Sequence, residues 1–85
     1  MANFELRFKR SVARDLRSIP GKDTRKILKR IKALAENPRP EGCIKLTGKE
    51  YYRVRAGNYR VVYEIRDAEL IILVIRIALR RKVYD

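Results

Sequence analysis

The sequence predicts an α+β domain in which two N-terminal antiparallel helices pack on a small, mainly antiparallel sheet, in the order β-α-α-β-β-β. Apolar residues recur at helical spacing in two segments of the first half of the chain. Alternating apolar and polar residues from Tyr51 to Ile65 flank Gly57-Asn58, a pair suited to a two-residue hairpin turn. The run Leu70 to Ile77 is apolar on both faces, as expected of a central strand. We expect residues 1–85 to form a single domain with one core.

The first half of the chain contains one strand and two helices. Asn3 to Phe8 alternates and predicts a short opening strand. The apolar spacing from Lys9 to Ile19 predicts a helix, which Pro20-Gly21 ends. A second helix is expected to begin after Asp23, as its N-cap, and to run to about Glu36, before two prolines. The apolar stripes of both helices must then dock on the sheet.

The second half supplies strands, of which Cys43 to Leu46 is the first and shortest. Folding the hairpin about its turn places Arg55 opposite Arg60. Arg53 shares their face, and the apolar residues, including Tyr52 and Tyr63, occupy the other. Because like charges directly opposite each other destabilise a sheet, this placement indicates an anionic ligand between them. An ordinary solvated strand face is the alternative interpretation.

The charge balance indicates a polyanionic partner. The chain has 22 Lys and Arg against 10 Asp and Glu, a net charge of +12. Such an excess opposes compaction by self-repulsion and is typical of proteins that bind nucleic acid or a membrane surface. Membrane binding is less favoured, because the longest apolar run is far shorter than the ~20 residues of a membrane span. With no secretory signal and a lone cysteine, Cys43, interpreted as a half-buried strand residue, we expect a cytoplasmic protein.

The residue types that the sequence lacks exclude several kinds of catalytic site. The chain has no histidine and one cysteine, and its glycines are scattered singly, so neither a metal site nor a phosphate loop is expected, and no cofactor. The arginines remain, and guanidinium groups bind phosphate and stabilise the charge of a phosphoryl transition state. RNA carries its own nucleophile, the 2′-OH. A proton acceptor would still be needed, and Tyr84, Glu64 or a partner could supply it.

Further cations are candidates for RNA contacts outside this face. The basic residues of the second predicted helix form a solvated face, or else bind RNA or an acidic partner. The predicted RNA-binding residues are Arg25, Lys26, Lys29, Arg30, Lys45, Arg81 and Lys82.

A pattern over nearly the whole chain resembles a known family. Its elements are L-x-x-N-P (Leu34, Asn37, Pro38), K-L-x-G (Lys45, Leu46, Gly48), YYRVRAGNYRVVYEI, and I-x-x-R-R-x-V-Y (Ile77, Arg80, Arg81, Val83, Tyr84). With these elements the chain resembles the RelE-type toxins of the RelE/ParE superfamily, the toxin half of bacterial and archaeal type II toxin–antitoxin pairs. The resemblance implies a RelE-like sheet with two N-terminal helices. It also implies an endonuclease that cuts mRNA in the ribosomal A site, without metal, by 2′-OH attack on the adjacent phosphate.

The resemblance also implies site residues. Family lysines correspond to Arg53 and Arg55, the family arginine after the turn to Arg60, the C-terminal arginine to Arg80 and the terminal tyrosine to Tyr84. These five are the predicted catalytic residues. The chain departs from the family at the first two, because arginine does not readily release a proton as lysine can. It also has Leu79 where many relatives have a histidine.

Three functions follow from these observations. The leading hypothesis is a ribosome-dependent mRNA endonuclease, whose partner is a RelB-like antitoxin with an acidic or amphipathic segment that covers the basic surface in a hetero-oligomeric complex. The second is a ParE-like inhibitor of DNA gyrase without nuclease activity. The third is an RNA- or ribosome-binding domain that has lost catalysis.

Overall fold

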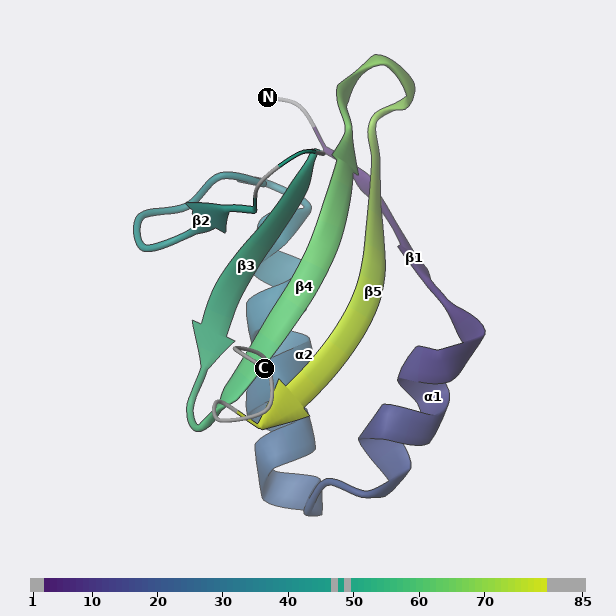
Figure 1. Cartoon of the computed structure of the whole chain (residues 1–85), viewed down its shortest axis with the longest axis vertical. Coiled ribbons are helices and arrows are strands. Elements are labelled where there is room, and N and C mark those ends of the chain that lie inside the picture. Colours follow the sequence, from purple (N-terminus) through teal and green to yellow (C-terminus); the bar gives the residue numbers. More distant parts are fainter. Residues whose placement is uncertain (1–2, 47, 49, 80–85) are drawn as a thin grey trace.

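A computed structural model describes residues 3–46, 48 and 50–79 of the chain (Figure 1). Its elements are β1 (Glu5–Phe8), α1 (Arg10–Arg17), α2 (Gly21–Leu34), β2 (Ile44–Lys45), β3 (Tyr51–Ala56), β4 (Tyr59–Arg66), the 3-10 turn η1 (Asp67–Glu69) and β5 (Ile71–Leu79). The predicted order of two helices between a first strand and the later strands is confirmed.

The strands form one five-stranded sheet in the order β1-β5-β4-β3-β2. The predicted, mainly antiparallel character is confirmed, because β2, β3, β4 and β5 pair in antiparallel fashion in sequence order. In the described part of the chain, β1 alone is parallel to its neighbour, with Glu5 opposite Ile71 and Phe8 opposite Val74. The last strand therefore lies between β1 and β4, in the interior position that its apolar sequence predicted.

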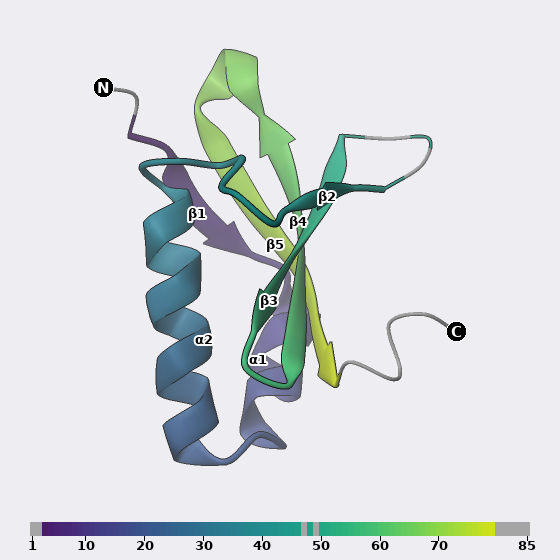
Figure 2. The same cartoon turned by 90° about the vertical axis from the view of Figure 1, so that its left-hand side faces the viewer.

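The core fills the space between α2 and the sheet. In Figure 1 α2 lies behind the sheet, and Figure 2 shows it along one face, with α1 near the end of β5. Ile27, Ile31 and Leu34 of α2 are buried, as is Val12 of α1. They meet the inward face of the sheet, whose fully buried members include Val54, Val61, Tyr63, Ile72 and Val74. The helical spacing of the apolar residues therefore does dock both helices, as predicted.

The start of α2 differs from its prediction. The helix begins at Gly21, with Pro20 at the N-cap position and no side-chain cap, and it ends at Leu34. The Pro20 carbonyl accepts the first backbone bonds, from the amides of Asp23 and Thr24 at 3.0 Å. Asp23 therefore lies in the first turn rather than before it, where its negative charge complements the partial positive charge of the helix end.

The β3–β4 hairpin has the predicted register, from Tyr51 opposite Glu64 to Ala56 opposite Tyr59. Gly57 has the expected positive φ, 62°, at the first position of the turn. A register shift between Val62 and Tyr63 interrupts the pairing of β4 with β5. Tyr52 and Tyr63 are part of the core as predicted, since Tyr52 is 6% exposed and Tyr63 is fully buried.

A polar network holds the segment after α2 against the far end of the sheet. Arg39 donates two bonds to the Asp67 carboxylate, at 3.2 and 2.9 Å, and a third from Nε to the Tyr52 hydroxyl at 3.2 Å. The Tyr52 hydroxyl donates in turn to Glu50 at 3.0 Å, and the Tyr63 hydroxyl donates to the Pro38 carbonyl at 2.7 Å. The Arg39 guanidinium also lies 5.2 Å from the centre of the Tyr52 ring. These contacts fix the position from which β2 begins.

No helix within residues 3–46, 48 and 50–79 combines the length and apolar character that crossing a membrane requires. Cys43 is half-buried, as interpreted from the sequence, but it lies just before β2 rather than inside it.

Candidate phosphate-binding site

Four neighbouring arginines lie on the sheet face that points away from α2. The pairing of β3 with β4 puts Arg55 opposite Arg60 and Arg53 opposite Val62, and β4 with β5 puts Val62 opposite Arg76. Side chains directly opposite each other in a sheet lie on the same face. We call the four neighbouring residues Arg53, Arg55, Arg60 and Arg76, drawn from three adjacent strands, the arginine face. Arg7 and Arg66 lie on the same side of the sheet, toward its other end.

The four members differ in exposure. Arg55 and Arg76 are exposed, whereas Arg53 is 9% exposed and Arg60 has no exposed surface. The interpretation as an ordinary solvated strand face is therefore wrong for two of the three predicted residues. Removing a guanidinium from water is costly unless other groups compensate its charge. Neither Arg53 nor Arg60 is without a partner.

Arg76 is the member of this face that the sequence did not reveal. It lies in β5, in a run of otherwise apolar residues. Simple alternation along that run fails because the register shift at Val62/Tyr63 changes which residues oppose β4. The signal in the sequence that could have revealed Arg76 is that it is the one charged residue of the apolar run that forms β5.

The face is strongly positive and suited to an anion. Glu64 lies on the same side of the sheet, is half-buried and accepts a bond from Arg66 Nε at 3.0 Å. Guanidinium groups in adjacent rows can each donate two parallel bonds to phosphate oxygens. Arginine donates but does not accept protons at neutral pH, so these side chains can bind and stabilise a phosphoryl group without acting as the base.

The basic residues of α2 meet one member of this face at the end of β3. Lys26, Lys29 and Arg30 line a groove of about 410 Å³ together with Arg55 and the turn of the hairpin. We call it the α2–β3 groove. Two of the predicted RNA-binding residues lie elsewhere, because Arg25 is not in the lining and Lys45 pairs with Glu50 at 3.3 Å near the opposite end of β3. The predictions for Arg80, Arg81, Lys82 and Tyr84 lie outside the described residues.

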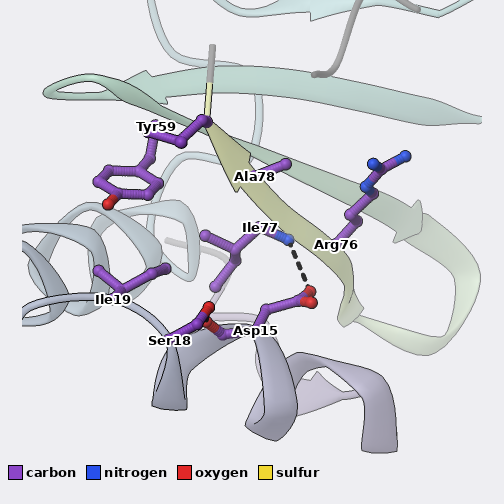
Figure 3. Close-up of a pocket in the computed structure, with 8 residues that line it drawn as sticks. Asp15, Ser18, Ile19, Tyr59, Arg76, Ile77 and Ala78 are labelled. Atoms are coloured by element: carbon purple, nitrogen blue, oxygen red, sulfur yellow. Dashed lines mark hydrogen bonds between the residues drawn. The ribbon is translucent and has the colours of Figure 1, made fainter. Parts of the chain in front are cut away.

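A second, smaller cavity of about 260 Å³ separates α1 from the end of β5 (Figure 3). Asp15 of α1 points into it and accepts a hydrogen bond from the Ile77 backbone amide at 3.2 Å. Tyr59 and Ile19 line another side of the cavity. Arg76 also lines it, and its side chain extends away from Asp15. Since β1 pairs with β5 only as far as Val74, Asp15 satisfies an edge amide that no strand of the described residues reaches.

This fold and site match toxins of known structure. RelE from a RelE–RelB complex of Pyrococcus horikoshii OT3 is 28% identical with a TM-score of 0.82, over 94% of this chain and 97% of that one. The isolated RelE toxin of Escherichia coli is 27% identical with a TM-score of 0.77, over 98% of this chain and 92% of that one. Toxin RelE3 of Methanocaldococcus jannaschii is 33% identical over 87 residues, covering 92% of each chain.

The family model described as the ParE toxin of the type II toxin–antitoxin system, parDE, matches residues 6–84. The chain therefore belongs to this family and is a toxin of the RelE/ParE superfamily of type II toxin–antitoxin systems. This membership confirms the resemblance noted in the sequence.

Proposed function

We propose that this toxin is a ribosome-dependent endonuclease that cleaves mRNA in the A site without a metal ion. The observation that carries the proposal is the arginine face, in which four cations from three adjacent strands lie on one side of the sheet. The relatives that carry the name RelE, among them Toxin RelE3 and the isolated RelE toxin of E. coli, support this activity over gyrase inhibition.

In this mechanism the substrate supplies the nucleophile and the arginines supply the charge. The 2′-OH attacks the adjacent phosphate, a new O–P bond forms, and the bond to the 5′-oxygen of the next nucleotide breaks. Arg53, Arg55 and Arg60 would hold the phosphate oxygens, and Arg80 would neutralise charge in the transition state. Glu64 and Tyr84 are this chain's candidates for moving the proton, because the arginines cannot accept it.

The solvent exposure of Arg55 and Arg60 indicates which of them a phosphate can contact first. Arg55 is exposed and can meet a phosphate directly. Arg60 has no exposed surface, so the substrate has to displace the groups that cover it before that guanidinium can bind. Part of the binding free energy is then used to open the face, as in other sites that complete themselves only around the substrate.

The same basic surface suits an antitoxin partner. The P. horikoshii structure is of a RelE–RelB complex, and an E. coli structure is of the intact RelBE toxin–antitoxin complex. We propose that a RelB-like antitoxin binds this chain and silences it by covering cations that RNA would otherwise contact. A surface this positive attracts an acidic segment as readily as it attracts RNA.

The test adds the purified toxin to ribosomes programmed with a defined mRNA and maps cuts by primer extension. We expect cuts within the A-site codon and none in naked mRNA. Arg55→Ala should lower the cleavage rate about a hundredfold, as removal of one transition-state donor does in other enzymes. Arg17→Ala, which removes an exposed arginine from α1, should leave the rate unchanged.

Arg55 is a better probe than Arg60, because Arg60 is fully buried and its removal would also disturb packing. Inhibition of gyrase supercoiling by a folded toxin that makes no cut would replace this proposal with the ParE-like function. Binding to ribosomes without a cut and without gyrase inhibition would indicate a domain that only binds.

A further inference from the structure

Arg76 is an exposed arginine whose charge the described part of the chain does not use. Its side chain forms no ion pair and no hydrogen bond with residues 3–46, 48 and 50–79. Two other arginines on the same side of the sheet are paired, since Arg7 bonds Glu5 at 2.8 Å and Arg66 bonds Glu64 at 3.0 Å. Among the described residues, Arg76 therefore presents a guanidinium that a ligand can bind without breaking an ion pair.

The packing of β5 gives no reason for an arginine at this position. β5 is an interior strand of the sheet and is otherwise apolar. Interior strands are stabilised best by β-branched and aromatic side chains. Arg76 also lies close to three other cations of the arginine face, and like charges on neighbouring strands repel each other. A bound anion reverses that repulsion, so the position indicates binding rather than stability.

The strand register separates Arg76 from the other exposed member of the arginine face. Arg55 and Arg60 are directly opposite each other in one row across the sheet, where β5 contributes Ala78. Arg76 lies in the next row, two strands away from Arg53. Two strand spacings are about 10 Å, compared with one spacing for the opposed pair. The opposed pair can therefore share one phosphate, whereas Arg76, on the β5 side of the face, is placed to bind another.

The backbone that carries Arg76 is held from the other side of the sheet. The amide of the peptide bond between Arg76 and Ile77 donates to the Asp15 carboxylate at 3.2 Å, in the part of β5 that lies beyond β1. Ile77 is buried in the core, and the Arg76 side chain extends away from Asp15 (Figure 3). The carboxylate thus fixes the strand and leaves the guanidinium to a ligand. A cation on a fixed strand loses less conformational freedom on binding than one on a loop.

We propose that Arg76, which the mechanism above does not use, forms a second phosphate subsite that binds an mRNA phosphate next to the scissile one. The ligand is a phosphodiester of the RNA backbone, contacted through its charge and not through a base. This inference rests on the proposed nuclease function and deepens it by assigning a substrate contact beyond the scissile bond. Because Arg76 does not touch the reacting atoms in this arrangement, it contributes to substrate binding and not to the rate of the chemical step.

The test measures binding of the toxin to ribosomes programmed with an mRNA that carries a 2′-deoxy nucleotide at the cleavage site and so cannot be cut. Arg76→Ala should weaken this binding about tenfold, the loss expected for one hydrogen-bonded charge. The matched control is Arg7→Ala, the same charge change on the same side of the sheet at a residue paired with Glu5, which should alter binding less than about twofold. Arg76→Lys keeps the charge and should bind within about threefold of the wild type.

Uncharged linkages in the mRNA identify the phosphate that Arg76 contacts. A methylphosphonate replaces one charged phosphate at a time along the mRNA. One linkage next to the scissile phosphate should, when neutralised, weaken wild-type binding about tenfold and Arg76→Ala binding less than about twofold, since both changes remove the same contact. Equal weakening of the two proteins at every linkage would overturn the proposal and assign any loss in Arg76→Ala to phosphates of ribosomal RNA.

Turnover of cleavable mRNA keeps this inference separate from the proposed function. Arg76→Ala should raise KM about tenfold and leave kcat within about twofold of the wild type, whereas Arg55→Ala should lower kcat. An unchanged KM in an active Arg76→Ala toxin would contradict the subsite alone. A wild-type toxin that makes no cut, but whose binding depends on Arg76 and on one charged linkage, would contradict the nuclease proposal alone.

Discussion

Two stacked tyrosines in the core carry similar rings but different hydroxyl environments. Tyr52 and Tyr63 lie 6.0 Å apart between ring centres. Tyr63 donates to the Pro38 carbonyl, whereas Tyr52 bonds Arg39 and Glu50. Since Arg39 and Glu50 are exposed, water can replace Tyr52 as their partner, but the Pro38 carbonyl is half-buried and depends on Tyr63.

Tyr63→Phe should therefore destabilise the fold more than Tyr52→Phe. We expect a loss of about 1–3 kcal/mol for Tyr63→Phe, which leaves an acceptor unsatisfied, against about 0.5–1.5 kcal/mol for Tyr52→Phe. Urea unfolding of both variants and the wild type measures the difference. A larger loss for Tyr52→Phe would mean that the network around Arg39 contributes more to stability than the buried carbonyl does.

The ionisation of Tyr63 should also lower the free energy of unfolding at alkaline pH. Burial, with a smaller contribution from Cys43, raises the pKa of Tyr63 well above its ordinary value. In the unfolded chain a tyrosine ionises near pH 10, so above about that pH the unfolded state releases a proton that the folded state retains. The contribution of Tyr63 is thus complete below about pH 10 and falls as the pH rises through the folded-state pKa.

Comparing unfolding free energies of the wild type and Tyr63→Phe at pH 8 and about pH 11 isolates this contribution. The wild type should lose more stability than Tyr63→Phe over that interval, since the variant lacks the titrating hydroxyl. Equal losses in both proteins would show that other groups dominate the alkaline response.

At the residue scale the sequence predicted what depends on alternation and missed what depends on distant contacts. Tyr52 and Tyr63 were placed in the core because strand side chains alternate. Arg39 was not singled out, because its bidentate bond to Asp67 joins positions 28 residues apart. Arg76 was missed because a local irregularity in strand pairing leaves no mark in a single sequence.

At the element scale, a hydrogen bond to the Asp15 carboxylate links α1 to β5. Asp15 accepts the Ile77 amide on the part of β5 that lies beyond β1. Asp15→Ala removes this acceptor and should reduce stability by about 1–3 kcal/mol, because hydrogen bonds to charged groups are among the stronger ones. Asp15→Asn retains an oxygen acceptor and should lose less.

Amide exchange at Ile77 tests that expectation locally. It should speed up in Asp15→Ala, whereas the amide of Ile72, in the part of β5 next to β1, should keep its wild-type protection. Unchanged exchange at Ile77 would indicate that packing around the cavity, rather than Asp15, protects this edge.

Among the elements, the hairpin was the most predictable and the start of α2 the least. A two-residue turn with glycine at a positive φ fixes every pair of the ladder, so one motif determined the whole register. The helix start depended on a choice between Asp23 as a cap and Pro20 before the first turn. Both patterns are compatible with a helix, and tertiary packing decides between them.

At the scale of the whole molecule, the net charge of +12 should give folding and binding opposite responses to salt. Screening relieves self-repulsion, so the unfolding free energy should rise between about 50 and 200 mM KCl. Binding to programmed ribosomes at constant Mg²⁺ should weaken about fiftyfold over that range if four phosphates are contacted. Urea unfolding and ribosome pelleting measure the two trends, and salt-independent pelleting would argue against a phosphate-dominated contact.

The fold class and element order could be predicted because each element carries its own local pattern. The parallel pairing of β1 with β5 could not, because those strands are separated by every other element of the chain. No periodicity or turn motif relates two segments so far apart, and their pairing follows only from assembly of the entire sheet.

The same pairing governs when the molecule can fold. β5 is flanked by β1 on one side and β4 on the other, so the sheet cannot close before the last strand is available. A nascent chain emerges from the ribosome in sequence order, and contacts between its two ends must wait until synthesis has passed β5. Until then β1 lacks its neighbour and Arg76 has not joined the other arginines. The arginine face of this toxin would consequently stay incomplete until the rest of the sheet has been synthesised and has closed around β5.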